Sequence, residues 1–144
     1  MKLQKLFSSV SLGVVRSDHS LFHGSITAKK YVAYRHVNAS RRGISYTPID
    51  VELEKLKLKR TVSLVVPSFQ AAILAAENSG LIATIPKILT RYAVSLGLRP
   101  FQIPVPLQPI TVFQAWHPRF DADPAHRFVR DSVAKACRLA LKRF

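Results

Sequence analysis

Short apolar runs alternate with stretches of helical periodicity along the chain. The runs are rich in β-branched residues and end near proline, glycine or polar clusters, which predicts strands at 6–16, 36–39, 61–66, 81–85, 98–105 and 110–116. The periodic stretches predict helices at 25–34, 69–78, 87–96 and 123–144, and one that begins at Thr47. Alternating strands and helices favour an α/β fold in which a mostly parallel sheet carries flanking helices.

Capping residues place the ends of several of these helices. Thr47 precedes Pro48, whose missing N–H costs nothing in the first turn, and Asp50 faces the positive end of the helix dipole. Asp123 and Pro124 begin the last helix in the same way. Gly80 and Gly97 follow two helices, where we expect left-handed stops.

Apolar spacing also predicts which faces are buried. In the helix from Thr47, one stripe holds Ile49, Leu53 and Leu56, and the run 62–66 favours a buried strand that Pro67 closes. In the last helix, one face holds the apolar residues Val129, Val133, Ala136, Cys137, Ala140 and Phe144, and the other holds Arg127, Asp131, Lys135, Arg138 and Lys142.

The turn after the run 62–66 is the candidate site with the clearest physical reason. Ser68 can accept from the free amides of the helix that follows, and open α/β sheets hold ligands where strands end and helices begin. His36 and Gln114 are two further polar residues in apolar surroundings, so together they favour a small-molecule pocket. Taken one at a time, each is more simply a satisfied core polar group, a cap or an edge residue.

Catalytic and metal-binding patterns do not emerge. Ser68 lacks the glycines of a nucleophile elbow, the five histidines have no metal spacing, and Arg41-Arg42-Gly43 has no phosphate-binding fingerprint around it. We therefore expect no enzyme and no cofactor.

The formal net charge is +14, which raises the question of nucleic-acid binding. Nine basic and three acidic residues lie in 27–60, and seven basic and three acidic residues lie in 117–144, so the charge is spread along the chain. Aromatic residues are not interleaved with it as in stacking platforms. A solvated basic surface is the simpler interpretation, and direct nucleic-acid contact stays open.

Length and composition indicate one domain in a reducing compartment. The chain has 144 residues, 48% of them hydrophobic, and a single cysteine, Cys137. Apolar runs are too short to span a bilayer, and the first residues lack a secretory signal. We expect a cytoplasmic protein without membrane contact.

Several ordered motifs resemble the effector-binding domain of LysR-type transcriptional regulators, in the branch of nodulation and nitroaromatic- or salicylate-responsive regulators. The likeness covers about residues 5–132. It is carried by 14–19 (VVRSDH), 60–69 (RTVSLVVPSF), 81–86 (LIATIP), 116–119 (WHPR) and 123–130 (DPAHRFVR).

The resemblance implies a two-lobed fold like that of type II periplasmic binding proteins. Residues 17–107 would form the second lobe, 6–15 and 110–116 two hinge strands, and 123–144 the C-terminal helix of the first lobe. It also implies a small acid effector, aromatic acids included, in the cleft between lobes, lined by His36, Asn38, Pro67, Ser68, Phe69 and Gln114.

The family's DNA-binding helix-turn-helix and early first-lobe elements have no counterpart in this sequence, which indicates a chain truncated at its amino end. We then expect no sequence-specific DNA binding by the chain itself, an exposed face on the last helix, and a homo- or hetero-oligomer with related regulators. A stand-alone small-molecule-binding module and a non-functional remnant are the alternative interpretations.

Overall fold

A computed structural model describes residues 1–143, which form two compact units. The five-strand unit comprises Val10–Gln108, and the two-strand unit comprises Met1–Ser9 with the segment from Pro109 onward. The five-strand unit therefore contains the whole of the expected second lobe, 17–107, and one strand more. No helix within residues 1–143 combines the length and apolar character needed to cross a membrane.

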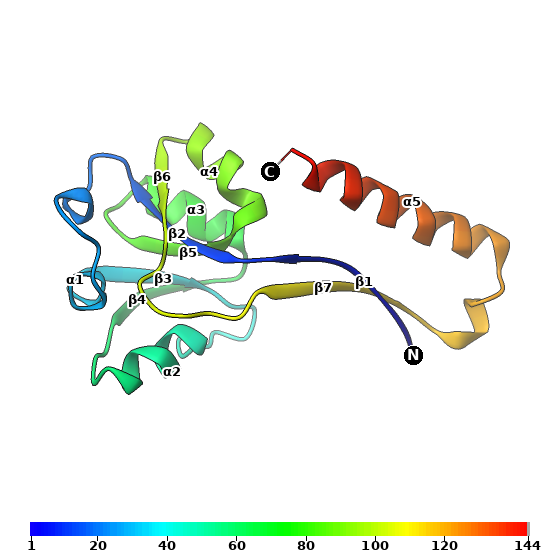
Figure 1. Ribbon diagram of the computed structural model, residues 1–144, viewed down its shortest axis with the longest axis horizontal. Helices are drawn as coiled ribbons and strands as arrows, with labels where there is room; N and C mark the ends of the chain where they lie inside the picture. Colours follow the sequence, from blue (N-terminus) through cyan, green and yellow to red (C-terminus); the bar gives the residue numbers. More distant parts are fainter. Residues whose placement is uncertain (144) are drawn as a thin grey trace. The chain divides into compact units, whose positions relative to one another are not determined.

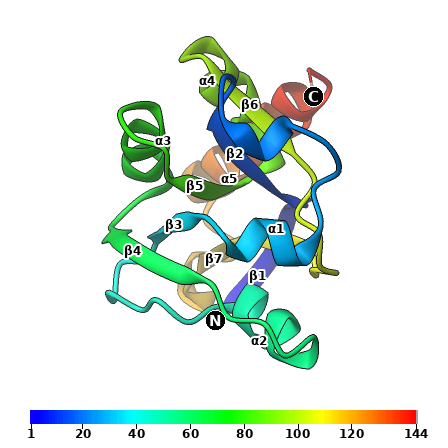
Figure 2. The same cartoon turned by 90° about the vertical axis from the view of Figure 1, so that its left-hand side faces the viewer.

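The five-strand unit is a sheet with helices on both faces (Figures 1 and 2). Its strands are β2 (Ser11–Arg16), β3 (Arg35–Ala39), β4 (Thr61–Val66), β5 (Ile82–Pro86) and β6 (Leu98–Phe101), in the order β4-β3-β5-β2-β6. Its helices are α1 (Ala28–Val32), α2 (Pro48–Lys55), α3 (Phe69–Glu77) and α4 (Thr90–Ser95), with short 3-10 turns η1 (Ser20–Phe22) and η2 (Lys87–Leu89).

The α/β fold class is confirmed, and the sheet is mixed. Strand β3 runs parallel to β4 and to β5, whereas β2 runs antiparallel to β5 and to β6. The chain passes from β3 to β4 through α2 and from β4 to β5 through α3, as the alternation of strands and helices predicts. Both antiparallel pairs involve β2, which follows β1 without a helix between them. The alternation of strands and helices therefore did not predict the direction of β2.

Two core clusters lie on opposite faces of this sheet. Successive strand residues point to opposite faces, so Val14 and Ala83 join one cluster while Val15 and Ile82 join the other. Helices α3 and α4 cover the first face, and α1 and α2 cover the second (Figure 2). The second cluster also holds Tyr31 and Leu53.

Three sequence expectations about burial and helix ends in this unit are wrong. Strand β4 is not buried: it is the edge strand, and Leu64 is 41% exposed. In α2, Ile49 and Leu53 are buried as expected, but Leu56 follows the last helical residue and is exposed. Gly80 is not a left-handed stop, because its φ is not positive and α3 already ends at Glu77, whereas Gly97 has the expected positive φ of 82°.

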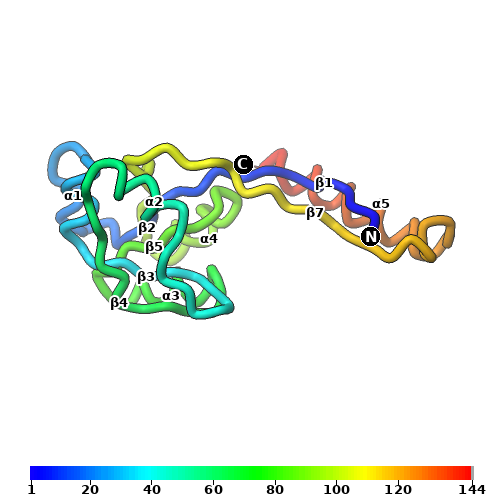
Figure 3. Tube along the Cα trace, turned by 90° about the horizontal axis from the view of Figure 1, so that it is seen from below, coloured from blue at the N-terminus to red at the C-terminus, as the bar shows by residue number. Residues whose placement is uncertain are grey.

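The two-strand unit pairs β1 (Lys2–Ser9) antiparallel with β7 (Ile110–Trp116), and Figure 3 shows the two strands side by side. The 3-10 turn η3 (Pro118–Phe120) and the helix α5 (Pro124–Leu141) follow, with Asp123 capping α5 as predicted. The run predicted as one strand, 6–16, is thus divided between β1 and β2 at Val10.

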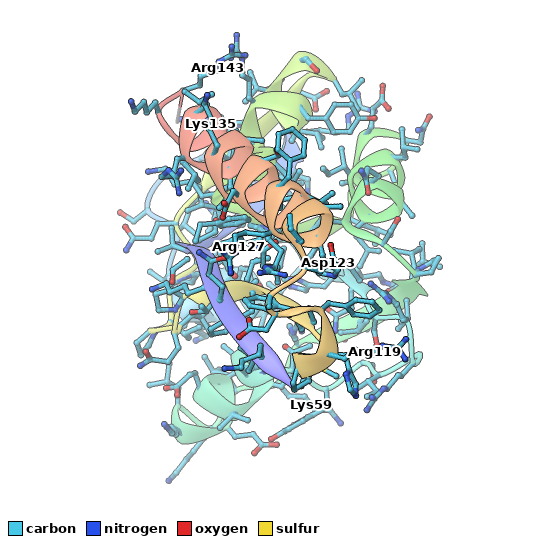
Figure 4. All side chains as sticks on the ribbon, turned by 90° about the vertical axis from the view of Figure 1, so that its right-hand side faces the viewer. Lys59, Arg119, Asp123, Arg127, Lys135 and Arg143 are labelled. Carbon is cyan, nitrogen blue, oxygen red and sulfur yellow. The ribbon has the colours of Figure 1, made fainter. Side chains whose placement is uncertain are left out.

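The apolar face of α5 is largely exposed, as expected. Val129 and Val133 are exposed, whereas Arg130 and Ala134 are buried. Phe144, the last residue assigned to that face, lies outside the described residues. The Arg130 guanidinium lies 4.3 Å from the centre of the Trp116 ring and donates to the carbonyls of Phe120 and Asp121. An arginine that stacks on an aromatic ring and donates to carbonyls can be buried at little cost. The pattern of apolar residues in the sequence does not predict such a contact. Figure 4 labels Arg127 and Lys135 along this helix, and both are exposed.

The packing of Gly13 gives a first prediction. Gly13 pairs with Phe101 across β2 and β6, and an added Cβ would lie 2.2 Å from Phe101 Cζ. We expect Gly13→Ala to lower the free energy of unfolding by about 1–3 kcal/mol, because the ring must leave its packed position. Urea denaturation measures this, with Gly80→Ala as the matched control, since its Cβ would meet nothing closer than 3.8 Å. Equal effects from the two variants would contradict the packing described.

Candidate functional site

The parallel strands β3 and β4 end side by side. The Ser40 amide, just after β3, donates to the Val66 carbonyl at the end of β4, at 2.8 Å. In open α/β sheets, ligands bind outside the carboxyl ends of the strands, where loops and helix starts converge. This edge of the five-strand unit is therefore the candidate site.

Pro67, Ser68 and Phe69 lie together at this edge. Ser68 is extended, with φ −148°, and its Oγ accepts from the Ala71 amide at 3.1 Å, which confirms it as the cap of α3. Pro67 and Ser68 are exposed, and Phe69 is half-buried against the first core cluster. The first amides of α3 point out of the helix end, where an acidic group finds N–H donors and a favourable dipole.

His36 lies inside the unit, near the amino end of β3. It is fully buried, and its ring centre lies 4.5 Å from that of Tyr31. Burial lowers the pKa of His36 to about 4, so the ring is neutral at pH 7. Its Nε2 lies 3.0 Å from the Tyr31 carbonyl, which can only accept, so Nε2 carries the proton. The other nitrogen, Nδ1, has no hydrogen-bond partner among residues 1–143.

Asn38 is also buried, and it belongs to a polar network rather than to the exposed edge. Its Nδ2 donates to the Ser45 carbonyl at 2.7 Å, and its Oδ1 accepts from Arg60 Nη2 at 3.1 Å. Arg60 also forms a bidentate pair with Asp50, at 2.8 Å from Nε to Oδ1 and 3.0 Å from Nη2 to Oδ2. Burial tends to raise the pKa of Asp50, but the hydrogen bonds from Arg60 and Thr47 outweigh it and hold that pKa below its usual range.

Arg60 and the second role of Asp50 were missed in the sequence. Arg60 is adjacent to other cations, as in the run Lys57-Leu58-Lys59-Arg60, so it looked like part of a solvated surface. A cavity of about 540 Å³ borders Arg60 and Asp50 near the amino end of β4. It lies at the opposite end of that strand from Ser68, so it is separate from the candidate site.

Gln114 lies in the two-strand unit, on β7. Its Nε2 donates to Gln4 Oε1 at 2.7 Å and to the Arg130 carbonyl at 3.1 Å, which ties β7 to β1 and α5. The structure therefore brings Pro67, Ser68 and Phe69 together at the exposed edge of the five-strand unit. His36 and Asn38 are buried in the same unit and contact other residues, and Gln114 belongs to the two-strand unit.

The groups at the edge suit binding rather than bond-making. Ser68 Oγ is occupied as a cap acceptor, and no base contacts it in the described part of the chain. Within residues 1–143, no three histidine, cysteine or acidic side chains gather in a way that would hold a metal ion. Amide donors, a hydroxyl and an aromatic ring are groups that a small organic acid can use.

Comparisons with known proteins agree on one kind of protein. No family model matches the sequence. The chain is 32% identical over 139 residues to the HTH-type transcriptional regulator SyrM of Rhizobium meliloti, covering 95% of this chain and 43% of SyrM. It is 26% identical over 128 residues to the HTH-type transcriptional activator NahR of Pseudomonas putida, covering 88% of this chain and 43% of NahR. The chain thus spans less than half the length of these relatives.

Solved structures of regulatory domains have the same fold. The regulatory domain of MexT, a transcriptional activator in Pseudomonas aeruginosa, matches with a TM-score of 0.77 and 29% identity, over 93% of this chain and 64% of that one. The effector-binding domain of QuiR in complex with shikimate matches with a TM-score of 0.70 and 19% identity, over 99% of this chain and 66% of that one.

The fold also matches CrgA, a LysR-type transcriptional regulator from Neisseria meningitidis, with a TM-score of 0.74 and 11% identity, over 94% of this chain and 47% of that one. The relatives are regulators of transcription and not enzymes. The similarity in sequence to SyrM and the similarity in fold to the MexT regulatory domain both extend over nearly the whole chain. The chain belongs to the LysR-type transcriptional regulators and corresponds to part of their effector-binding domain.

Proposed function

We propose that this chain is the ligand-sensing part of a LysR-type regulator and that it binds a small organic acid to control transcription. The observation that carries the proposal is the carboxyl edge of β3 and β4, where Ser68 caps α3 and the exposed strand ends meet. The QuiR effector-binding domain, which has this fold, is in complex with shikimate, a small carboxylic acid. This similarity across nearly all of the chain favours a sensing domain over a stand-alone binding module.

The residues proposed to contact the effector differ in how accessible they are. Pro67, Ser68 and Phe69 are accessible and would meet the effector directly, its carboxylate facing the first amides of α3. His36 and Asn38 are buried and hydrogen-bonded within the unit, and Gln114 belongs to the other unit. Contact of these three residues with the effector stays a prediction of the family resemblance.

Regulation would work through a shift between states. An effector changes a regulator only by binding one of its conformations more tightly than another, and DNA is then held differently. We propose that DNA is contacted through a helix-turn-helix outside these residues, that the protein forms oligomers with itself or with related regulators, and that it acts in the cytoplasm, where DNA is accessible.

Isothermal calorimetry with salicylate and shikimate tests the site. We expect the wild-type chain to bind at least one of these acids and Ser68→Ala to bind it roughly tenfold more weakly, because the cap orients the first turn of α3. We also expect Ser68→Ala to lower the free energy of unfolding by about 1 kcal/mol through loss of the cap.

Ser63→Ala is the matched control, because Ser63 is an exposed serine on the same edge strand and five residues from the site. It should leave both affinity and stability unchanged. If Ser63→Ala and Ser68→Ala bound the acid equally well, the site would lie elsewhere, and no heat from the wild-type chain with either acid would count against the proposed function.

A further inference from the structure

One buried cation, Arg60, joins three segments of the five-strand unit. The Arg60 side chain has no exposed surface, and it makes four hydrogen bonds: two to Asp50, one to Thr47 Oγ1 at 3.0 Å and one to Asn38 Oδ1 at 3.1 Å. Asn38 lies on β3, Thr47 and Asp50 begin α2, and Arg60 itself leads into β4. The guanidinium therefore fixes the distance between the two ends of the loop formed by residues 40–47.

The 40–47 loop has few other contacts to hold it. Every residue from 41 to 46 is exposed, including Ile44 and Tyr46. Within the loop, Ser40 Oγ accepts from the amides of Arg42 and Ile44. From outside, Asn38 Nδ2 donates to the Ser45 carbonyl, and Asp50 Oδ2 accepts from the Thr47 amide at 2.7 Å. Tyr46 also donates its hydroxyl to Glu54 Oε2 at 2.9 Å, in an exposed contact. The two partly buried tethers at the far end of the loop, at Ser45 and Thr47, both lead back to Arg60 through one residue.

The loop starts at the candidate site. Ser40 is bonded to Val66, the residue immediately before Pro67, so the first loop residues lie beside the proposed effector contacts. A loop that is already ordered costs a ligand less conformational entropy on binding than one that must be fixed at that moment.

We propose that Arg60 is a positioning residue for effector binding, holding the 40–47 loop in its receptive conformation through Asp50, Thr47 and Asn38. This inference rests on the proposed function and identifies the residue that orders the loop beside the proposed effector site. The role requires arginine, because a planar fork can hold a carboxylate with two nitrogens and still reach Asn38, whereas a lysine ammonium is a single point charge. Geometry, and not charge alone, is what the loop depends on.

Hydrogen exchange on the full chain, without any ligand, tests the positioning directly. We expect Arg60→Lys to increase the exchange rate of the amides in 40–47 by roughly tenfold relative to the wild type, since the loop opens locally when its tethers are lost. Asn38→Ala, which keeps the Arg60–Asp50 pair and removes the link to Ser45, should loosen the same amides with a smaller loss of global stability. Calorimetry with salicylate and shikimate should show roughly tenfold weaker affinity for both variants than for the wild type.

Ile73→Val is the control, because Ile73 is buried in the core cluster on the opposite face of the sheet. It lowers stability without touching the network, so its loop amides should exchange as in the wild type. If the loop of Arg60→Lys were as protected as that of Ile73→Val, Arg60 would be only a structural residue and the inference would be overturned. Hydrogen exchange is measured without an effector. A wild type that bound no acid would therefore reject the proposed function, while the exchange rates would still show whether Arg60 holds the loop.

Discussion

Replacing Asp50 by alanine is expected to lower the free energy of unfolding by about 3–5 kcal/mol, which is the largest single effect that this structure predicts. Asp50 is the carboxylate partner of Arg60, whose side chain is fully buried. Removing the carboxylate leaves a buried guanidinium without its counter-charge and the Thr47 amide without its acceptor. Urea denaturation of the wild type and the variant measures the difference.

Two further variants distinguish the loss of a buried ion pair from the loss of a surface charge. Asp18→Ala removes the partner of Arg16 in an exposed pair, where we expect no measurable change in stability because water screens the pair. The double variant Asp50→Ala with Arg60→Met should recover part of the loss, because an apolar side chain needs no counter-charge. A loss for Asp50→Ala no larger than that for Asp18→Ala would show that the pair is not buried as described.

The second large effect contrasts two leucines of one helix. Leu53→Ala should lower the free energy of unfolding by about 2–5 kcal/mol, because Leu53 is fully buried in the second core cluster and its truncation leaves a cavity. Leu56→Ala should stay within about 0.5 kcal/mol, because that side chain is 53% exposed. Chemical denaturation of the two variants gives the comparison.

These two leucines are matched in chemistry and nearly in position, so they test the packing of α2 alone. Both belong to the apolar stripe that the sequence predicts. Similar losses at both positions would mean that α2 extends further and packs along the whole stripe.

Much of the local structure was available from the sequence because its causes are local. Thr47 and Pro48 begin α2, Asp123 caps α5, and Gly97 ends the helix before β6, as predicted. A cap needs only a side-chain oxygen and amides two or three residues away, so neighbouring residues suffice to specify it. Strand positions followed from β-branched runs for the same reason.

The candidate site was found in part. Ser68 was correctly predicted as the cap of α3, because strand, proline, serine and helix follow one another in the chain. The network around Arg60 was missed, because its members are separated by up to 22 residues and meet only when β3, α2 and β4 assemble. The family resemblance identified these motifs without explaining why the arginine is there.

The sequence by itself determined the kinds of element, their caps and the family to which the chain belongs. Only the tertiary structure decided which apolar residues are covered: Leu64 lies on an edge strand, and Leu56 follows the end of α2. The physical reason is that a hydrophobic residue is buried by whatever packs against it, and that partner comes from a distant part of the chain. The same reason explains Arg60, a charged side chain that can be buried only because the fold brings Asp50, Thr47 and Asn38 to it.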